Sequence, residues 1–373
     1  MKKLLRTSAL AMMLAMTANM ADARDLRVAP GAPPAHPANS HLYSKLVDYL
    51  KEESGGSLTA TMIGPEVVSI GQMKDALQSN LAEVGNLLPL YFPADLPNMA
   101  LVGEMALAGR NAQAMGAAMT EYMVNCAPCQ AEMSKFGVVY VGSGSSDVYA
   151  ILSKKPVRTA ADLKGLKLRS GGAPFSRWAE KFGAVPASMS VFATFESMSG
   201  GVIDGTMASV ADLLSFRIVE LAKYVTLLDL GTYHATSNFT VNKGVWDSLN
   251  KADREAFARA ANRANADFTD RWGREMPIAA VAAAKKAGIE FIEPDADLVA
   301  ATEAFAAADQ KTAAEIAKER FGMDDAADRV ATFVGLVDKW TKIVNEEKND
   351  AVAIAKRVQT EVWDKVDMAS YGK

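Results

Sequence analysis

Residues that carry most enzyme chemistry are scarce in this sequence. It contains three histidines and two cysteines among 373 residues, and it has no H-E-x-x-H, G-x-S-x-G or P-loop motif. The nearest match to a dinucleotide-binding motif, residues 142–147, has Asp147 where the turn needs a third glycine, and a strand-like stretch follows where a helix is required. The sequence therefore favours a protein that is not an enzyme and that has no cofactor and no metal site.

Long apolar runs are missing after the first 23 residues. The N-terminus combines three basic residues, an apolar stretch over residues 9–16 and Ala-Asp-Ala at residues 21–23, as export signals do. An apolar stretch of about ten residues is roughly half of what a bilayer span needs, which weighs against a membrane anchor. We expect residues 1–23 to be a signal peptide, cleaved after Ala23, and the mature chain to reach the periplasm. Cleavage takes the net charge from −4 to about −6, which disfavours nucleic acid as a partner.

The only cysteines, Cys126 and Cys129, form a C-x-x-C pair. In an oxidising compartment such a pair is expected to close as a local disulfide, whereas in the cytosol it would indicate redox or metal chemistry. With just three histidines as further ligands, a zinc site is disfavoured. We expect a structural disulfide, and a redox function is the alternative.

Short apolar strands alternate with amphipathic helices along most of the chain, a pattern typical of parallel sheets covered by helices. Once the first 23 residues are removed, the length suits two domains of ordinary size. Strands are expected over residues 26–29, 58–63, 82–87 and 138–141 in one domain and over residues 148–152, 166–169 and 184–189 in the other.

Residues 160–164 are expected to form a helix, and the last eighty residues read as packed helices. The predicted fold class is α/β, with two α/β domains and a cleft between them. Residues 24–147 with about 235–275 are assigned to domain I. Residues 148–234 with about 276–373 are assigned to domain II, which includes the helical C-terminal part.

One expected strand ends in a basic residue. Arg169 closes the strand over residues 166–169, directly before Ser170 and two glycines. Side chains at the carboxyl ends of parallel strands face the crevice where small ligands bind. A guanidinium can donate two parallel hydrogen bonds to a carboxylate at every relevant pH. Arg169 is therefore a candidate clamp for an anion, and a surface salt bridge is the alternative.

Four segments resemble the solute receptors of tripartite ATP-independent periplasmic (TRAP) transporters, the DctP-type family. In the family's order and spacing they are PPAHP (33–37), QMKDALQS (72–79) with YFPADLP (91–97), DLKGLKLR (162–169) with GAVP (183–186), and GVIDG (201–205). The resemblance implies two α/β domains around a hinged cleft and a long helix spanning both, for which residues 252–286 are the candidate. It also implies a bidentate contact of Arg169 with the ligand carboxylate and delivery of the ligand to membrane permease subunits.

The chain departs from several sugar-acid receptors of this family, which carry a second arginine and an asparagine where this sequence has Tyr149 and Ala208-Ser209. A dicarboxylate or a sugar acid would leave polar groups unpaired, at about 1 to 3 kcal/mol for each neutral group. Aromatic residues stand in their place, which favours a monocarboxylate with an apolar or aromatic body. The predicted ligand contacts are Arg169, Tyr149, Phe192, Ser209, His234, Phe92, Tyr91 and His36.

The sequence thus predicts a receptor that binds a small organic acid anion without transforming it and closes around it by domain rotation. One alternative is a periplasmic enzyme acting on a carboxylate, with Arg169 as anchor and His234 as acid or base. Another is a ligand-binding receptor that serves a sensor. For His234 a structural, hydrogen-bonded role is equally compatible with the sequence.

Overall fold

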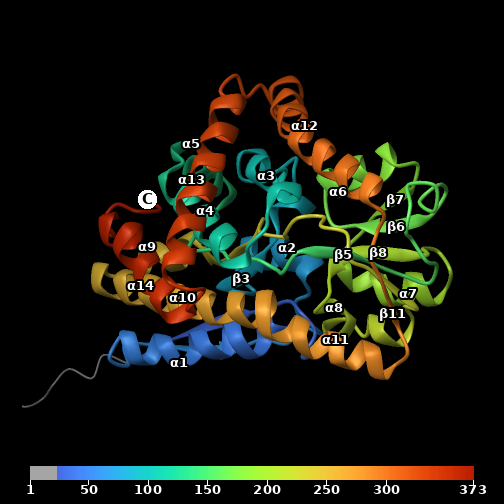
Figure 1. Ribbon diagram of the computed structural model, residues 1–373. Coiled ribbons are helices and arrows are strands. Elements are labelled where there is room, and N and C mark those ends of the chain that lie inside the picture. Colours follow the sequence, from blue (N-terminus) through green and yellow to red (C-terminus); the bar gives the residue numbers. More distant parts are fainter. Residues whose placement is uncertain (1–22) are drawn as a thin grey trace, which may run out of the picture.

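The computed structural model describes residues 23–373, and its strands form two separate sheets, each covered by helices (Figure 1). We call the parts built on the two sheets the first lobe and the second lobe. The predicted signal peptide lies outside the described residues, apart from Ala23. Among the helices of residues 23–373, none combines the length and the apolar character that a membrane crossing requires.

The sheet of the first lobe has the order β2-β1-β3-β10-β4. β1 pairs in parallel with β2 and β3, whereas β10 runs antiparallel to both of its neighbours. Its strands are β1 (Arg24–Ala29), β2 (Leu58–Met62), β3 (Val84–Leu87), β4 (Val138–Tyr140) and β10 (Ser237–Asn242).

The sheet of the second lobe has the order β11-β9-β5-β8-β6-β7. β6 pairs in parallel with β7 and β8, whereas β5 is antiparallel to β8 and β9. Its strands are β5 (Tyr149–Ser153), β6 (Lys167–Ser170), β7 (Val185–Ser188), β8 (Gly205–Ser209), β9 (Tyr224–Thr226) and β11 (Glu290–Ile292).

The expectation of wholly parallel sheets is wrong at β5 and β10. Both strands carry the chain from one lobe into the other, β5 into the second lobe and β10 back into the first. A parallel neighbour needs a helical crossover within its own lobe, and a strand that arrives directly from the other lobe has none. The two lobes are therefore joined by extended chain at their facing edges.

Helices cover both sheets because their apolar residues recur on one face. In α6, for example, Pro174 stands in the first turn, and Phe175, Trp178 and Ala179 are buried at the spacing of one helical face. The helices of the first lobe are α1 (Ser44–Glu53), α2 (Met73–Gln78), α3 (Pro97–Gly103), α4 (Ala112–Asn125), α5 (Ala127–Phe136), α9 (Lys243–Ser248) and α10 (Lys251–Asp270). Those of the second lobe are α6 (Ala173–Lys181), α7 (Thr194–Ser199), α8 (Asp212–Ser215) and α11 (Met276–Lys286).

A long helix spans both lobes, as the resemblance implies. α10 continues through a wider turn at Arg271–Glu275 into α11 without a break. α10 packs against α1 and α4, and α11 packs against α8 of the second lobe (Figure 1). This helix forms one wall of the space between the lobes.

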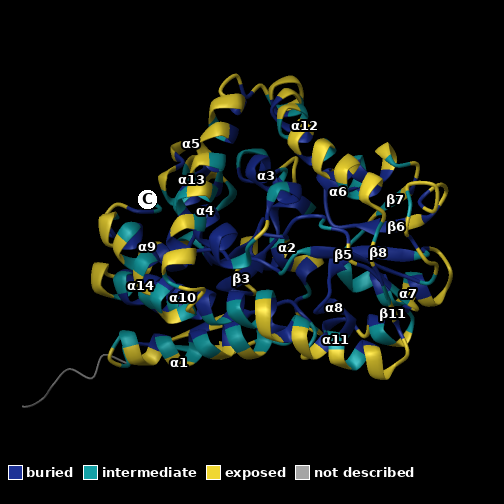
Figure 2. Ribbon diagram, in the orientation of Figure 1, coloured by how far each residue is buried: buried dark blue, intermediate teal, exposed yellow. Residues whose placement is uncertain are grey.

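The C-terminal helices α12 (Ala296–Phe321), α13 (Ala326–Glu346) and α14 (Ala351–Glu361) differ in placement from the expected domain II. α12 contacts α6 of the second lobe, but it also contacts α3, and α13 packs on α4 while α14 packs on α10. Trp340 on α13 donates a 2.6 Å hydrogen bond to Glu121 on α4, which holds that helix on the first lobe. α12 and α13 form a hairpin whose outer faces are exposed (Figure 2). The division into domains stays a prediction, and α13 and α14 depart from it.

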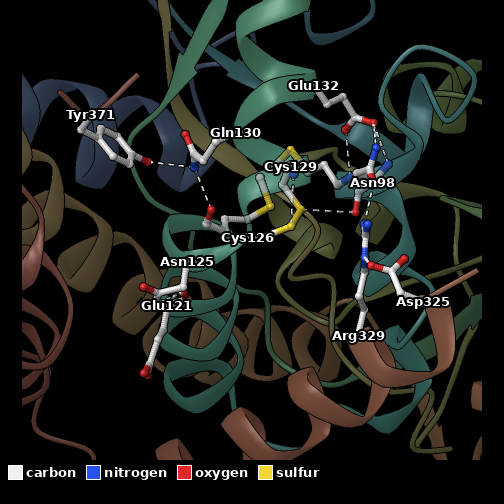
Figure 3. Close-up of a disulfide and its surroundings, with 12 residues drawn as sticks. Asn98, Glu121, Asn125, Cys126, Cys129, Gln130, Glu132, Asp325, Arg329 and Tyr371 are labelled. Carbon is white, nitrogen blue, oxygen red and sulfur yellow. Dashed lines mark hydrogen bonds and ion pairs between the residues drawn. A yellow bond between two sulfur atoms is a disulfide. The ribbon is translucent and has the colours of Figure 1, made fainter. Parts of the chain in front are cut away.

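The two cysteines are joined in a disulfide where α4 ends and α5 begins (Figure 3). Cys126 precedes the first turn of α5, and its sulfur accepts a hydrogen bond from the Cys129 N–H at 3.2 Å. The Glu132 carboxylate accepts the backbone N–H groups of Asn98 at 2.7 Å and Met99 at 3.0 Å, which ties α5 to α3. Both cysteines are buried, which favours the structural role over the redox alternative.

Residues 160–164 form turns, so the helix expected there is wrong. The Asp162 carboxylate accepts the backbone N–H groups of Arg158 at 3.0 Å and Thr159 at 2.8 Å. Such local side-chain bonds compete with helix formation. Gly165, with a φ of +73°, then turns the chain into β6.

Candidate functional site

A small cavity lies between the lobes. The first lobe contributes side chains from β3, from the start of β10 and from the segments that follow β1 and β2, and the second lobe contributes the edge where β6 and β8 end. The long helix supplies Phe268 and Trp272. The remaining lining residues include Ile70, Leu88, Val191, Phe216 and Tyr233, so most of the wall is apolar or aromatic.

Arg169, at the end of β6, is the cationic group of this cavity. Its side chain is buried, and its Nε donates to the Met189 carbonyl at 3.0 Å while Nη2 donates to the Tyr91 hydroxyl at 2.9 Å. Among residues 23–373, Nη1 has no hydrogen-bond acceptor. A guanidinium has five N–H groups, so three are free, enough for a bidentate contact with a carboxylate.

The guanidinium of Arg169 is positioned by backbone as well as by side chains. A Cβ added to Gly171 would lie 3.1 Å from both Nη1 and Nη2, so any larger residue would press on the guanidinium. Burial lowers the pKa of Arg169, but nearby Tyr91 and Tyr149 outweigh it and the net pKa is raised. The group therefore stays charged.

Tyr91 links the lobes at this point. It belongs to the first lobe, in the short helix Pro89–Tyr91, and its hydroxyl accepts both the Arg169 bond and the Val191 N–H at 3.1 Å. Both donors are in the second lobe. Since the hydroxyl hydrogen is not used in either bond, it is available to a ligand beside the guanidinium.

The cavity also contains buried polar atoms with no hydrogen-bond partner among the described residues. They are Oδ1 of Asn86, Asn238 and Asp212, the hydroxyl of Tyr233 and Nε1 of Trp272. An unsatisfied buried polar atom costs about 1 to 3 kcal/mol. Several such atoms around one cavity are typical of a site that is completed by a bound molecule.

His36 lines the cavity as a neutral side chain. Burial lowers its pKa to about 3. Its Nδ1 accepts the Ala38 N–H at 3.1 Å, so the ring proton is on Nε2. The ring packs against Phe216 and Trp272, with centroid distances of 5.5 and 5.3 Å. His36 thus adds a neutral donor among aromatic rings.

Four of the eight predicted contact residues line this cavity, namely Arg169, Tyr149, Tyr91 and His36. Tyr149 begins β5 at the point where the chain enters the second lobe, and its ring stacks on Phe175 at 5.1 Å. These four come from β5, from β6, and from a loop and a short helix of the first lobe. Tertiary structure brings them together across more than a hundred residues of sequence.

The other four, Phe92, Phe192, Ser209 and His234, lie outside the lining. Lys74 lies over the Phe92 ring, and Phe192 packs edge-on against Phe216. The Ser209 hydroxyl donates to the Asp147 carboxylate. Their contact with a ligand stays a prediction.

His234 is buried beneath the C-terminal helices. Its Nε2 and the Val102 carbonyl are 3.0 Å apart, and its ring stacks on Phe333 of α13 at 5.3 Å. Burial lowers its pKa to about 4, so the ring is neutral at physiological pH. This geometry is that of a structural, hydrogen-bonded histidine.

The contacts predicted from the sequence do not include Asp212, Asn86, Asn238, Tyr233 and Trp272. Asn86 could have been predicted, because it is a polar residue inside an otherwise apolar strand. Asp212 follows β8 by three residues, but that strand was not recognised. Among residues 23–373, no group of three or more His, Cys, Asp or Glu side chains is arranged to hold a metal ion.

Two α/β lobes joined by crossing strands and a shared helix, with a buried arginine between them, define a periplasmic binding protein-like fold. Residues 28–318 match the family model of the bacterial extracellular solute-binding proteins, family 7. The chain belongs to this family, that of the TRAP transporter solute-binding proteins, which serve transport rather than catalysis.

Known relatives and solved structures support the same assignment. A solute-binding protein of Verminephrobacter eiseniae is 34% identical over 128 residues, or 32% of this chain and 38% of the relative. A TRAP solute-binding protein from Rhodoferax ferrireducens, in complex with copurified benzoate, is 21% identical with a TM-score of 0.75, covering 86% of this chain and 99% of its own. One from an unidentified marine microbe, specific for aromatic acid ligands and bound to 3-hydroxybenzoate, is 22% identical with a TM-score of 0.76, covering 85% of this chain and 99% of its own.

Proposed function

We propose that this chain is the receptor of a TRAP transporter for a monocarboxylate with an apolar or aromatic body, and that Arg169 binds the ligand carboxylate. The observation that carries the proposal is the buried guanidinium with three free N–H groups in a cavity walled mainly by apolar and aromatic side chains. A carboxylate would pair with the charge, and the rings would bury the body of the ligand.

Ligand-linked closure follows from the same contacts. Tyr91 of the first lobe and Arg169 of the second would hold one carboxylate between them, because the Tyr91 hydroxyl can donate while it accepts from Arg169. A ligand that contacts both lobes binds the closed form more tightly than the open form and so shifts the population toward closure. The closed form would then be the one that the membrane permease subunits recognise, and a periplasmic location after export of the chain agrees with this role.

Solved structures of the same fold agree with this class of ligand, since the two described above carry benzoate and 3-hydroxybenzoate. At 21% and 22% identity they share the fold. Support for the proposed ligand class therefore comes from the cavity of this chain.

The test is a thermal-shift and calorimetric screen of the mature protein against aromatic monocarboxylates, aliphatic keto and hydroxy acids, dicarboxylates and sugar acids. A ligand at 100 times its dissociation constant stabilises the folded state by about 2.7 kcal/mol. We expect the aromatic monocarboxylates to give the largest shifts and to be recovered unchanged by mass spectrometry. Turnover would favour the enzyme alternative.

Arg169→Met tests the clamp, and Arg320→Met, at an exposed arginine of α12, is the matched control. Loss of a buried, hydrogen-bonded charge partner costs about 2 to 5 kcal/mol, which is a weakening of about 30-fold to several thousandfold. We expect this loss for Arg169→Met and unchanged binding for Arg320→Met. Equal affinity of the Arg169→Met variant and the wild type would contradict the clamp.

A further inference from the structure

A second charged side chain lies at the same edge of the second-lobe sheet as Arg169. β6 and β8 are parallel neighbours. Arg169 is the penultimate residue of β6, and Asp212 begins the helix that follows β8. Because the carboxyl ends of parallel strands meet at one edge, both side chains face the cavity, and both line it.

The carboxyl group of Asp212 is buried and incompletely paired. The residue is 2% exposed, and among residues 23–373 its Oδ1 has no hydrogen-bond donor. Burial raises the pKa of Asp212 to about 7, and the charge of Arg169 and the nearby Trp272 and Ser215 oppose this only in part. Arg169 donates its hydrogen bonds to Met189 and Tyr91, and among residues 23–373 it makes none to Asp212. The guanidinium therefore keeps its free N–H groups for a ligand, and the carboxyl keeps a free acceptor.

The groups around Asp212 leave that acceptor to a ligand. The nearby Asp147 carboxyl accepts a hydrogen bond from Ser209, and burial, with a smaller effect from the charge of Asp212, raises the pKa of Asp147. The neighbouring first-lobe atoms, Oδ1 of Asn86 and Oδ1 of Asn238, are acceptors as well and also lack donors. A hydrogen-bond donor on the body of a bound molecule would satisfy these acceptors.

We propose that Asp212 determines the specificity of the site by accepting a hydrogen bond from a hydroxyl or amino group on the body of the ligand and by excluding a second carboxylate. The inference rests on the proposed function, since it takes the ligand carboxylate to be at Arg169. It narrows the ligand class to monocarboxylates that carry a hydrogen-bond donor, such as hydroxy- or amino-substituted aromatic acids. Above the pKa of about 7 of Asp212, a second carboxylate would meet a buried group of the same charge, so binding is measured at about pH 8.5.

The experiment is calorimetric titration of the mature protein with benzoate, the three hydroxybenzoate isomers, 3- and 4-aminobenzoate, and isophthalate and terephthalate. Hydrogen bonds to a charged group contribute about 1.5 to 3 kcal/mol. We therefore expect at least one substituted acid to bind about tenfold to a hundredfold more tightly than benzoate. We expect the two dicarboxylates to bind more weakly than benzoate.

Asp212→Leu and Asp212→Asn separate the two parts of the proposal. Asp212→Leu should abolish the preference for the substituted acid over benzoate while benzoate binds at least as well as before. Asp212→Asn keeps an acceptor but not the charge, so it should retain part of that preference and bind the dicarboxylates at least tenfold better. Asp338→Asn, at an exposed aspartate of α13, removes one charge far from the cavity and should change none of these ratios.

The outcomes distinguish this inference from the proposed function. If no wild-type acid binds, or if Arg169→Met binds all of them normally, the proposed function fails. If the acids bind through Arg169 but the wild type does not prefer a donor-bearing acid, the specificity proposal is overturned. The same holds if both Asp212 variants, folded by circular dichroism, keep the wild-type order of affinities.

Discussion

Replacement of Asp212 by asparagine should remove part of the pH dependence of the free energy of unfolding. Burial raises the pKa of Asp212 from 3.8 to about 7, and the charge of Arg169 only partly opposes this. The folded state therefore holds a proton that the unfolded chain releases, and the free energy of unfolding falls as the pH rises from about 4 to about 7. Asparagine carries no such proton, so the variant should not show this loss.

The magnitude follows from the shift in pKa. A difference of about 3 pKa units corresponds to about 4 kcal/mol at 1.36 kcal/mol per unit, which is an upper value for a group beside Arg169 and Asp147. Because the charge of Asp212 also raises the pKa of Asp147, its removal eases ionisation of Asp147 and acts in the same direction. Relative to the wild type, Asp212→Asn should gain up to about 4 kcal/mol between about pH 4 and about pH 8.

The assay is urea denaturation of the ligand-free mature protein at several pH values, followed by circular dichroism for both proteins. Only the difference between the two unfolding free energies is interpreted, because the other titrating groups contribute to both. Asp338→Asn serves as the control and should give a difference that is flat with pH. A flat difference for Asp212→Asn would refute the reasoning, because it would mean that Asp212 is ionised in the folded state as easily as in the unfolded chain.

Three further variants test other contacts. Arg177→Met leaves the buried Asp309 carboxylate and the partly buried Glu104 carboxylate without the 2.7 Å bonds they now receive. It should lower the free energy of unfolding by about 3 to 5 kcal/mol, as measured by urea denaturation. Joint replacement of Cys126 and Cys129 by alanine should lower it by about 2 kcal/mol, because the disulfide closes only a short loop. Tyr91→Phe, which removes the hydroxyl that orients Arg169, should weaken ligand binding about tenfold in a calorimetric titration without changing the fold.

Each of these variants has its own control. The loss in free energy of unfolding caused by Arg177→Met should become smaller at low pH. Burial raises the pKa of its partner Glu104, which becomes neutral there. A deficit independent of pH would contradict the ion-pair account. Reductant should destabilise the wild type as much as the double cysteine replacement does and should leave that variant unchanged. Unaltered affinity of Tyr91→Phe would mean that Arg169 needs no support from the first lobe.

The sequence by itself determined the class of protein, through the resemblance of four segments to a known family, and it singled out Arg169. Strands and helices alternate locally, so the two α/β lobes could be predicted from periodicity, whereas the long helix was implied by the resemblance. Arg169 could be found because a charged residue directly after a strand and before two glycines is a local pattern. The turn at residues 160–164 was missed because a single carboxylate, that of Asp162, binds backbone groups that a helix would otherwise use.

Only the tertiary structure decided which aromatic and polar side chains meet at the cavity. Tyr91 and Phe92 are adjacent and similar in sequence, yet one bonds Arg169 and the other lies under Lys74. The position of Asp212 at the cavity could not be predicted from the sequence, because it depends on the pairing of β8 with β6, a contact between distant segments. Periodicity reports which side of an element is apolar, but the partner across a cleft is set by how two lobes pack, and no local pattern encodes that packing.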